Sequence, residues 1–301
     1  MRLRTRALTV SLAAALTSAA TVLTLAPAQA APGGPGGPGG PGGPKEDGVV
    51  VIAHRGSSAA APENTLAAAR QALREKADEI ENDIQRTADG VLILMHDATL
   101  VRTTDAEEVF PDRAPWNVGD FTLAEIKRLD AGSWFSPRYA GERVPTLAEW
   151  SRVVGQRSRM LLEVKNPTSY PGIETDLDRA LDTDPHLRTA DRRDRLVVQS
   201  FDIAWMRAFE EVDPEVAKGL LYGRTPTAAD IAAARPWAEW INPSFRVITE
   251  ADVDAIHAAG LRTGVYTVNM EADMRRLVSW DVDAIITDVP PVLQRVLREG
   301  R

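Results

Sequence analysis

Short apolar runs alternate with amphipathic stretches along most of the chain. Eight runs are rich in β-branched residues and are expected to be buried strands: Val49–Ala53, Glu79–Asp83, Met160–Lys165, Leu196–Ser200, Lys218–Tyr222, Glu239–Pro243, Thr263–Val268 and Ala284–Thr287. Apolar positions recur at helical spacing in Thr65–Lys76, Thr146–Gly155, Ile173–Thr183, Thr249–Gly260 and Met270–Trp280. This alternation is typical of βα units. Eight such units favour an α/β fold, a closed (β/α)8 TIM-type barrel, over an open doubly wound sheet, and no Gly-x-Gly-x-x-Gly motif follows any of the strands.

A ninth apolar run, Val91–Met95, follows the second strand too closely to be parallel to it, because a parallel crossover needs about a dozen residues or more. The dipeptide Asp89-Gly90 between the two runs is a strong signal for a two-residue hairpin turn. A turn centred there pairs Asp83 with His96. We therefore predict that the second strand folds over as a hairpin and leads into a small insertion, residues 97–143, on the barrel mouth.

The first residues have the layout of a secretory signal peptide. Residues 1–30 contain three arginines, then a long uncharged stretch rich in Ala, Leu, Thr and Val, and end in Ala28-Gln29-Ala30. We expect cleavage after Ala30 and a secreted, extracellular mature protein. Residues 31–47 contain four Pro-Gly-Gly repeats and are interpreted as a flexible linker. The barrel domain is then expected to span residues 48–301.

The charge and the cysteine content of the chain exclude several kinds of binding partner and reactive site. The chain has 35 Lys and Arg against 43 Asp and Glu, a net charge of −8, and no cysteine. Bulk binding of nucleic acid is not expected, because no basic stripe is evident along the sequence to displace counterions. Disulfides, thiolate metal sites and cysteine nucleophiles are excluded as well. Beyond the leader, no apolar stretch is long enough to span a bilayer, so stable membrane insertion is not expected.

Charged residues interrupt the apolar runs where the strands are expected to end. Glu81 and Asp83 close the second strand, and Glu163 and Lys165 close the next strand that is expected in the barrel. The two-residue period of a strand points each pair to one face. If that face is the barrel interior, three buried carboxylates converge, and a bound cation would offset their repulsion. Oxygen ligands without thiolates favour one divalent cation, Ca²⁺ or Mg²⁺, over zinc.

The positive side chains beside these carboxylates are suited to a phosphate group. Arg55, after the first strand, can bind phosphate oxygens in a bidentate manner, and Lys165 can supply a point charge. A cation next to both would complete a receptor for the oxygens of a phosphodiester.

Two of the four histidines follow predicted strand ends. His54 follows the first strand and His96 ends the hairpin. Because histidine titrates near neutral pH, one can take a proton from the attacking oxygen while the other protonates the leaving alkoxide. Phosphodiester cleavage is therefore the chemistry that this set of residues favours. His186 and His257 lack convergent partners and are interpreted as structural.

The motifs that carry these residues occur together and in order along Val49–Pro291. They are His54-Arg55-Gly56, Pro62-Glu63-Asn64-Thr65, Glu81-Asn82-Asp83-Ile84-Gln85, Thr87-Ala88-Asp89-Gly90, His96-Asp97-Ala98-Thr99-Leu100, Arg102-Thr103-Thr104, Asp130-Ala131-Gly132-Ser133-Trp134-Phe135, Val144-Pro145-Thr146-Leu147, Glu163-Val164-Lys165, Gln199-Ser200-Phe201, Tyr266-Thr267-Val268-Asn269 and Ile286-Thr287-Asp288. The set resembles the signature of the glycerophosphodiester phosphodiesterase family, in its secreted bacterial form.

The resemblance implies an α/β barrel with an insertion after the second strand. It also implies hydrolysis of glycerophosphodiesters, such as glycerophosphocholine or glycerophosphoethanolamine, to glycerol 3-phosphate and an alcohol. The residue roles that it implies are general acid and base for His54 and His96, metal ligands for Glu81, Asp83 and Glu163, and phosphate binding for Arg55 and Lys165.

Three further assignments stay open in the sequence. Asn64 either donates to the site or, like Thr65, caps the first helix, and Glu63 has no fixed role. Phe201 and Tyr266 are candidate substrate-pocket residues, and Tyr266 stands where relatives often carry tryptophan. Trp134 and Phe135 are candidate pocket walls that can equally be packing residues.

Two competing functions remain at the level of the sequence. One is a phospholipase of the phosphoinositide-cleaving or sphingomyelinase D type, but the insertion shows no continuous apolar face for a lipid. The other is a secreted phosphodiester-binding module without turnover, which requires a missing acid, base or metal ligand. No such residue is missing here.

Overall fold

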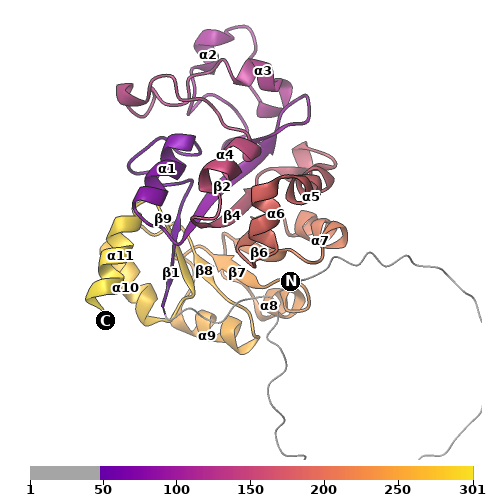
Figure 1. Cartoon of the computed structure of the whole chain (residues 1–301). Coiled ribbons are helices and arrows are strands. Elements are labelled where there is room, and N and C mark those ends of the chain that lie inside the picture. Colours follow the sequence, from indigo (N-terminus) through magenta and orange to yellow (C-terminus); the bar gives the residue numbers. More distant parts are fainter. Residues whose placement is uncertain (1–47, 301) are drawn as a thin grey trace, which may run out of the picture. The chain divides into compact units, whose positions relative to one another are not determined.

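A parallel barrel forms the centre of the described chain, residues 48–300, in this computed structural model (Figure 1). Its strands are β1 (Val50–Ala53), β2 (Glu79–Arg86), β4 (Arg159–Val164), β5 (Leu196–Ser200), β6 (Ala217–Tyr222), β7 (Trp240–Pro243), β8 (Gly264–Val265) and β9 (Ala284–Thr287). They pair in the order β7-β6-β5-β4-β2-β1-β9-β8. Parallel bridges from Trp240 to Arg262 and from Ser244 to Tyr266 join β7 to the segments flanking β8. The predicted (β/α)8 TIM-type fold is confirmed.

Helices cover the outside of the barrel (Figure 1). They are α1 (Leu66–Arg74), α4 (Leu147–Val154), α5 (Ile173–Thr183), α6 (Pro185–Asp191), α7 (Ile203–Val212), α8 (Ala228–Ala234), α9 (Glu250–Ala258), α10 (Glu271–Ser279) and α11 (Pro290–Glu299). Local sequence sets their ends. Thr146 starts α4 in a capping box with Glu149, and Gly155 ends it at φ 56°, a backbone conformation that favours glycine. The predicted helix Ile173–Thr183 is observed with both ends in place.

The hairpin after β2 is present, but its predicted register is wrong by one residue. The antiparallel strand β3 (Leu92–Leu94) pairs Ile84 with Leu94, and the Met95 backbone N–H donates to the Asp83 carbonyl at 3.0 Å. Asp83 therefore faces Met95 and not His96. The cause is the turn, which holds three residues and ends at Gly90 with φ 84°, the geometry of a turn with a bulge.

The insertion has its own small apolar core. After β3 it contains α2 (Ala106–Val109), the 3-10 turn η1 (Val118–Asp120), α3 (Leu123–Ile126) and the 3-10 turn η2 (Pro137–Tyr139). Phe121, Ile126 and Leu129 are fully buried in a cluster that includes Ile93 of β3. Figure 1 shows this part above the strand ends of the barrel. The main core lies between the sheet and the helices, where Ile80, Leu162 and Val198 pack against α1, α4 and α5.

The predicted leader and linker, residues 1–30 and 31–47, lie outside the described residues. Within residues 48–300, no helix has the length and apolar character needed to cross a bilayer.

Candidate active site

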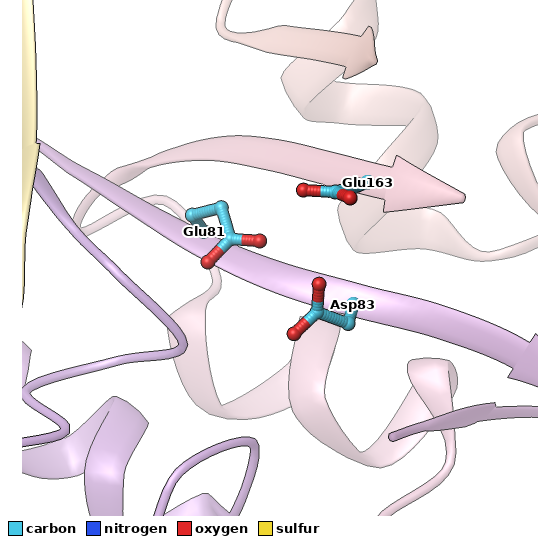
Figure 2. A group of neighbouring side chains, drawn as sticks. All are labelled: Glu81, Asp83 and Glu163. Atoms are coloured by element: carbon cyan, nitrogen blue, oxygen red, sulfur yellow. The ribbon is translucent and has the colours of Figure 1, made fainter. Parts of the chain in front are cut away.

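Three buried carboxylates from two neighbouring strands converge inside the barrel. Glu81 and Asp83 lie on β2 and Glu163 lies on β4, where Asp83 and Glu163 are register partners. One oxygen of each lies within 4.8 Å of the others, and Figure 2 shows the carboxylates turned toward one another. The two-residue strand period placed them on one face, as the sequence predicts.

The three buried carboxylates repel one another, and a bound cation would offset this repulsion. Burial first, and then repulsion by Asp83 and Glu163, raises the pKa of Glu81 well above its usual value. Burial and Asp83 likewise raise the pKa of Glu163 to about 7. The Oε1 atom of Glu81 is buried and has no hydrogen-bond partner among residues 48–300. All three candidate ligands offer carboxylate oxygens, so the residues fit a hard divalent cation.

Two positive side chains flank the triad. The Arg55 Nε atom lies 3.1 Å from Asp83 Oδ2, and the Lys165 ammonium lies 2.6 Å from Glu163 Oε1 and 3.8 Å from Asp83 Oδ1. Burial raises the pKa of Asp83, but Arg55 and then Lys165 outweigh it and hold that pKa below its usual value. The triad is therefore partly neutralised by the side chains that the sequence assigns to phosphate.

The loop after β1 shapes this end of the site. Arg55 adopts a left-handed backbone conformation at φ 55°, and its N–H donates to Glu81 Oε2 at 2.6 Å. Gly56 follows at φ 83°, and a Cβ there would lie 2.6 Å from the Ala68 backbone of α1. Glycine is thus required for the loop to pack against the helix while Arg55 turns inward.

Asn64 and Thr65 are neighbours in the sequence but make different hydrogen bonds. The Asn64 amide donates to Asp83 Oδ2 at 2.8 Å, and its Oδ1 accepts from the Asp83 N–H at 3.1 Å. Thr65 is the N-cap of α1, and its hydroxyl accepts from the Ala68 N–H. Asn64 therefore orients a carboxylate of the triad, and its neighbour performs the capping.

His54 is held by a carboxylate at the end of the last strand. Its Nδ1 lies 2.6 Å from Asp288 Oδ1, which also accepts from the Ser58 hydroxyl at 2.8 Å. Burial raises the pKa of Asp288, but the bonds from His54, Ser58 and Asn269 outweigh burial and hold it at about 2. Because Asp288 is ionised, it acts as an acceptor, so His54 donates through Nδ1 and its other ring nitrogen, Nε2, does not take part in this bond.

His96 has a matching arrangement. Its Nδ1 lies 2.6 Å from Asp97 Oδ1, and burial lowers the His96 pKa. Arg102 donates to Asp97 from Nε at 2.6 Å, and this bond is the main reason why the Asp97 pKa falls to about 2. Both histidines are close enough to Asp83 to influence its pKa. The structure thus brings them to the same site from two different loops.

The candidate pocket residues form two groups. Phe201, which follows β5, meets Tyr266 edge to face with ring centroids 5.6 Å apart, and the Lys165 ammonium lies 5.4 Å from the centre of the Phe201 ring. Phe201 is 45% exposed, so its ring is accessible beside the charged cluster. Trp134 and Phe135 instead pack on each other in the insertion.

Three residues of the site lie in recognised motifs but had no predicted role. Asp288 follows the last strand, so the rule that polar groups cluster at strand ends could have identified it. Asp97 is the neighbour of His96. Arg102 gives no periodic signal, because it acts between two loops. Of the remaining histidines, His186 lies in α6, and His257 bonds Asp283 before the first residue of β9, at the opposite end of the barrel.

Comparison with known proteins identifies a family. The sequence profile of the "Glycerophosphoryl diester phosphodiesterase family" matches residues 54–292. The glycerophosphodiester phosphodiesterase of Bacillus subtilis (strain 168) is 35% identical, over 83% of this chain and 87% of its own length. The glycerophosphodiester phosphodiesterase of Caldanaerobacter subterraneus subsp. tengcongensis is 37% identical, over 83% and 98%.

Solved structures agree with the sequence relatives. A phosphodiesterase of Oleispira antarctica, in complex with the product sn-glycerol-3-phosphate, superposes with a TM-score of 0.72 at 30% identity, covering 83% of this chain and 96% of that one. A protein of Silicibacter pomeroyi described as a putative glycerophosphoryl diester phosphodiesterase has a TM-score of 0.72 at 27% identity, covering 85% and 95%.

Proposed function

Because the chain belongs to the glycerophosphoryl diester phosphodiesterase family, we propose that it hydrolyses small glycerophosphodiesters, such as glycerophosphocholine or glycerophosphoethanolamine, to glycerol 3-phosphate and an alcohol. One observation carries the proposal. A buried carboxylate triad, two cationic side chains and two carboxylate-bound histidines converge at the carboxyl ends of the barrel strands. The product held by the Oleispira antarctica phosphodiesterase supports a glycerol phosphate group as the part that is recognised.

His54 and His96 are the proposed acid and base. Asp288 and Asp97 each fix one Nδ1 as a donor, which leaves both Nε2 atoms for proton exchange. One histidine removes a proton from the attacking oxygen nucleophile, and the other protonates the alkoxide that leaves phosphorus.

Glu81, Asp83 and Glu163 are the proposed ligands of one divalent cation, Ca²⁺ or Mg²⁺. When bound, such a cation supplies Lewis-acid stabilisation of negative charge on phosphoryl oxygens. Arg55 and Lys165 bind the same phosphate group through charge-assisted hydrogen bonds. Because the surface as a whole is acidic, substrate capture depends on these local cations.

Phe201 and Tyr266 are proposed to form one wall of the substrate pocket next to Lys165. The Tyr266 hydroxyl donates to the Tyr222 carbonyl at 2.9 Å, so its ring is held in place and presents its edge to Phe201. An exposed aromatic ring suits the apolar or cationic part of a head-group alcohol.

The nucleophile is either water or the glycerol 2-hydroxyl, and the two routes give different intermediates. Attack by the hydroxyl forms a cyclic phosphate that is hydrolysed afterwards, whereas water gives glycerol 3-phosphate directly. Phosphorus NMR through the time course separates them, and absence of a cyclic species at every time point counts against the internal route.

We further propose that residues 1–30 are a signal peptide and that the mature protein is released outside the cell. N-terminal sequencing of protein from the culture medium of the producing cell should find Ala31 first. An intact Met1 on the external protein contradicts cleavage after Ala30.

The deciding experiment uses protein that begins at Ala31, stripped with chelator and mixed with glycerophosphocholine. Release of glycerol 3-phosphate is measured with Ca²⁺, with Mg²⁺ and without metal, for the wild type, His54→Ala and His96→Ala. We expect metal-dependent release that each substitution reduces by about 10²–10⁴-fold, the usual contribution of general acid or base catalysis. No release from a folded protein that binds the cation contradicts the substrate assignment.

A further inference from the structure

A large basic groove lies at the end of the barrel opposite the catalytic site. It has a volume of about 1040 Å³ and lies where β2, β4 and β5 begin. Arg159 is the first residue of β4, and Arg195 directly precedes β5. The catalytic residues follow the other ends of these strands, so the groove is a separate surface. Figure 1 shows α1 and α4, which border it, packed side by side.

The charge of this groove is opposite to that of the chain. Among residues 48–300, seven cationic and two acidic side chains line it, although acidic residues outnumber basic ones in the whole sequence. Six of the cations form no ion pair within residues 48–300: Arg70, Arg74, Lys76, Arg157, Arg193 and Arg195. The seventh, Arg159, lies 3.9 Å from Glu79.

Within the described part of the chain, the hydrogen bonds of these cations go to uncharged groups. Arg74 bonds Gln71, its neighbour on the same helix, and Arg157 bonds the Val153 carbonyl. Glu75, which follows Arg74, instead accepts from Ser57 and Gln71 and neutralises no groove cation.

Helix dipoles explain only part of this charge. The carboxyl ends of α1 and α4 favour cations, which accounts for the arginine at the end of α1. Arg193 and Arg195, however, lie in the loop between α6 and β5 and contact Gln156 at 3.3 and 3.1 Å. Cations from three separate segments therefore face one concave space in which Asp78 and Asp194 are the only acidic side chains among the described residues, and a bound anion would reduce the mutual repulsion of the cations.

We propose that this groove binds a flexible polyanion that carries closely spaced phosphate groups and no aromatic bases. The guanidinium fork matches phosphate oxygens in a bidentate manner, and a volume of about 1040 Å³ can hold several phosphate groups at once. No aromatic side chain lines it, so the stacking that single-stranded nucleic acids use is absent from the described groove. The inference does not depend on the reaction at the other end of the barrel.

The test measures binding of inorganic polyphosphate to the mature protein by titration calorimetry at several salt concentrations. The groove variant is Arg70→Gln with Arg193→Gln, two exposed residues on separate segments. The matched control is Arg235→Gln with Arg298→Gln, which removes the same charge at exposed positions outside the groove. We expect the groove variant to lose affinity about tenfold or more and the slope of log K against log salt to become shallower by about 1 per arginine, with the control within twofold of wild type.

Poly-L-glutamate and an oligothymidylate strand of matched charge serve as comparison ligands and should each bind about tenfold more weakly than polyphosphate. Equal losses in groove and control variants, or no polyphosphate binding by the wild type, overturn the site. Equal or tighter binding of polyglutamate overturns the preference for phosphate, and tighter binding of oligothymidylate indicates a nucleic acid instead. Thermal melts of each variant verify folding, and Arg74→Gln with Arg157→Gln replaces the first pair if its melt is disturbed.

Discussion

Arg102 donates to both carboxylate oxygens of Glu63, at 2.8 and 2.7 Å, and so joins the insertion to the loop after the first barrel strand. The same guanidinium donates to Asp97, which holds His96, while Glu63 also accepts from Arg55 at 2.8 Å. The proposed proton-transfer group and the proposed phosphate-binding group are thus connected through one planar side chain. Arg102 therefore helps to fix the positions of His96, through Asp97, and of Arg55, through Glu63.

Arg102→Lys should lower kcat by about 10–100-fold, the effect usual for a residue that orients catalytic groups. Lysine keeps the positive charge but lacks the fork that binds two carboxylates together. Steady-state kinetics with glycerophosphocholine measure the effect. The control is Arg113→Lys in the same insertion, where the guanidinium donates to Glu125 at 2.9 Å and to the Asp120 carbonyl at 2.8 Å. Equal activity of both variants contradicts a positioning role for Arg102.

Glu81→Gln should raise the melting temperature of metal-free protein and abolish stabilisation by Ca²⁺ or Mg²⁺. Glu81 is 1% exposed, and its pKa is raised by burial and by Asp83 and Glu163, so removing its charge relieves repulsion. A cation at 100 times its dissociation constant stabilises the wild type by about 2.7 kcal/mol. That corresponds to roughly 5–10 °C in a domain of this size.

Differential scanning calorimetry of Glu81→Gln and wild type, with chelator and with each cation, measures both the melting temperature without metal and its increase with metal. The control is Glu142→Gln, which removes a carboxylate in the insertion, away from the triad. A Glu81→Gln protein that melts lower than wild type in chelator, or that still gains stability with metal, contradicts the proposed cation site.

Strand positions were largely predictable because burial leaves a strong pattern. Leu196–Ser200 and Ala284–Thr287 were predicted with both ends in place. The run Thr263–Val268 gave a strand of only Gly264–Val265, because pairing also depends on the neighbours: Val265 pairs with Ile285, and Tyr266 then bridges to Ser244. An apolar pattern predicts which residues are buried, whereas the bounds of a strand depend on its backbone hydrogen bonds to both adjacent strands.

The same distinction applies to the site. Glu81, Asp83 and Glu163 were predictable, because the two-residue period of a strand fixes which side chains share a face. The hydrogen bonds of Arg102 and Asp288 could not be predicted in this way, because they join loops whose relative position is set by tertiary packing. Nothing periodic in the sequence relates Arg102 to Glu63, which lies 39 positions away.

The insertion loop after Asp130 should show acid-dependent stability. Asp130 accepts from the N–H groups of Gly132, Ser133 and Gly141 at 2.8, 2.7 and 2.7 Å. Burial raises the pKa of Asp130, but these bonds outweigh it and lower that pKa to about 2. A depressed acid pKa stabilises the fold above the unfolded value, about 3.9, and this contribution is lost as the pH falls through about 2.

Asp130→Asn should therefore destabilise the protein by about 1–2 kcal/mol at pH 7, because solvent screening of this half-buried carboxylate reduces the value usual for hydrogen bonds to an ionised group. The deficit should shrink as the pH is lowered from 4 toward 2. Urea denaturation at a series of pH values measures it, with Asp112→Asn, an exposed residue of the same insertion, as the control. A deficit that is independent of pH would show that charge is not the cause.

Asn82→Leu should stabilise the protein. Asn82 lies on β2 between Ile80 and Ile84, on the strand face that packs against the helices, and is 1% exposed. Neither its amide nitrogen nor its amide oxygen has a hydrogen-bond partner among residues 48–300. An unsatisfied buried polar group costs about 1–3 kcal/mol, and leucine has the same branching at Cγ and suits the apolar surroundings. The expected rise in melting temperature is roughly 2–12 °C.

Asn242→Leu is the matched control, because this second buried asparagine has both amide atoms satisfied. Its Nδ2 donates to Gln199 Oε1 at 2.9 Å, and its Oδ1 accepts from the Gly264 N–H at 2.9 Å. Leucine there leaves a buried N–H without a partner, so the melting temperature should fall. Calorimetry of the two variants shows whether stability rises only where the replaced amide lacks hydrogen bonds or wherever leucine replaces a buried asparagine. A decrease in both melting temperatures would mean that Asn82 contributes to packing more than its unpaired amide costs.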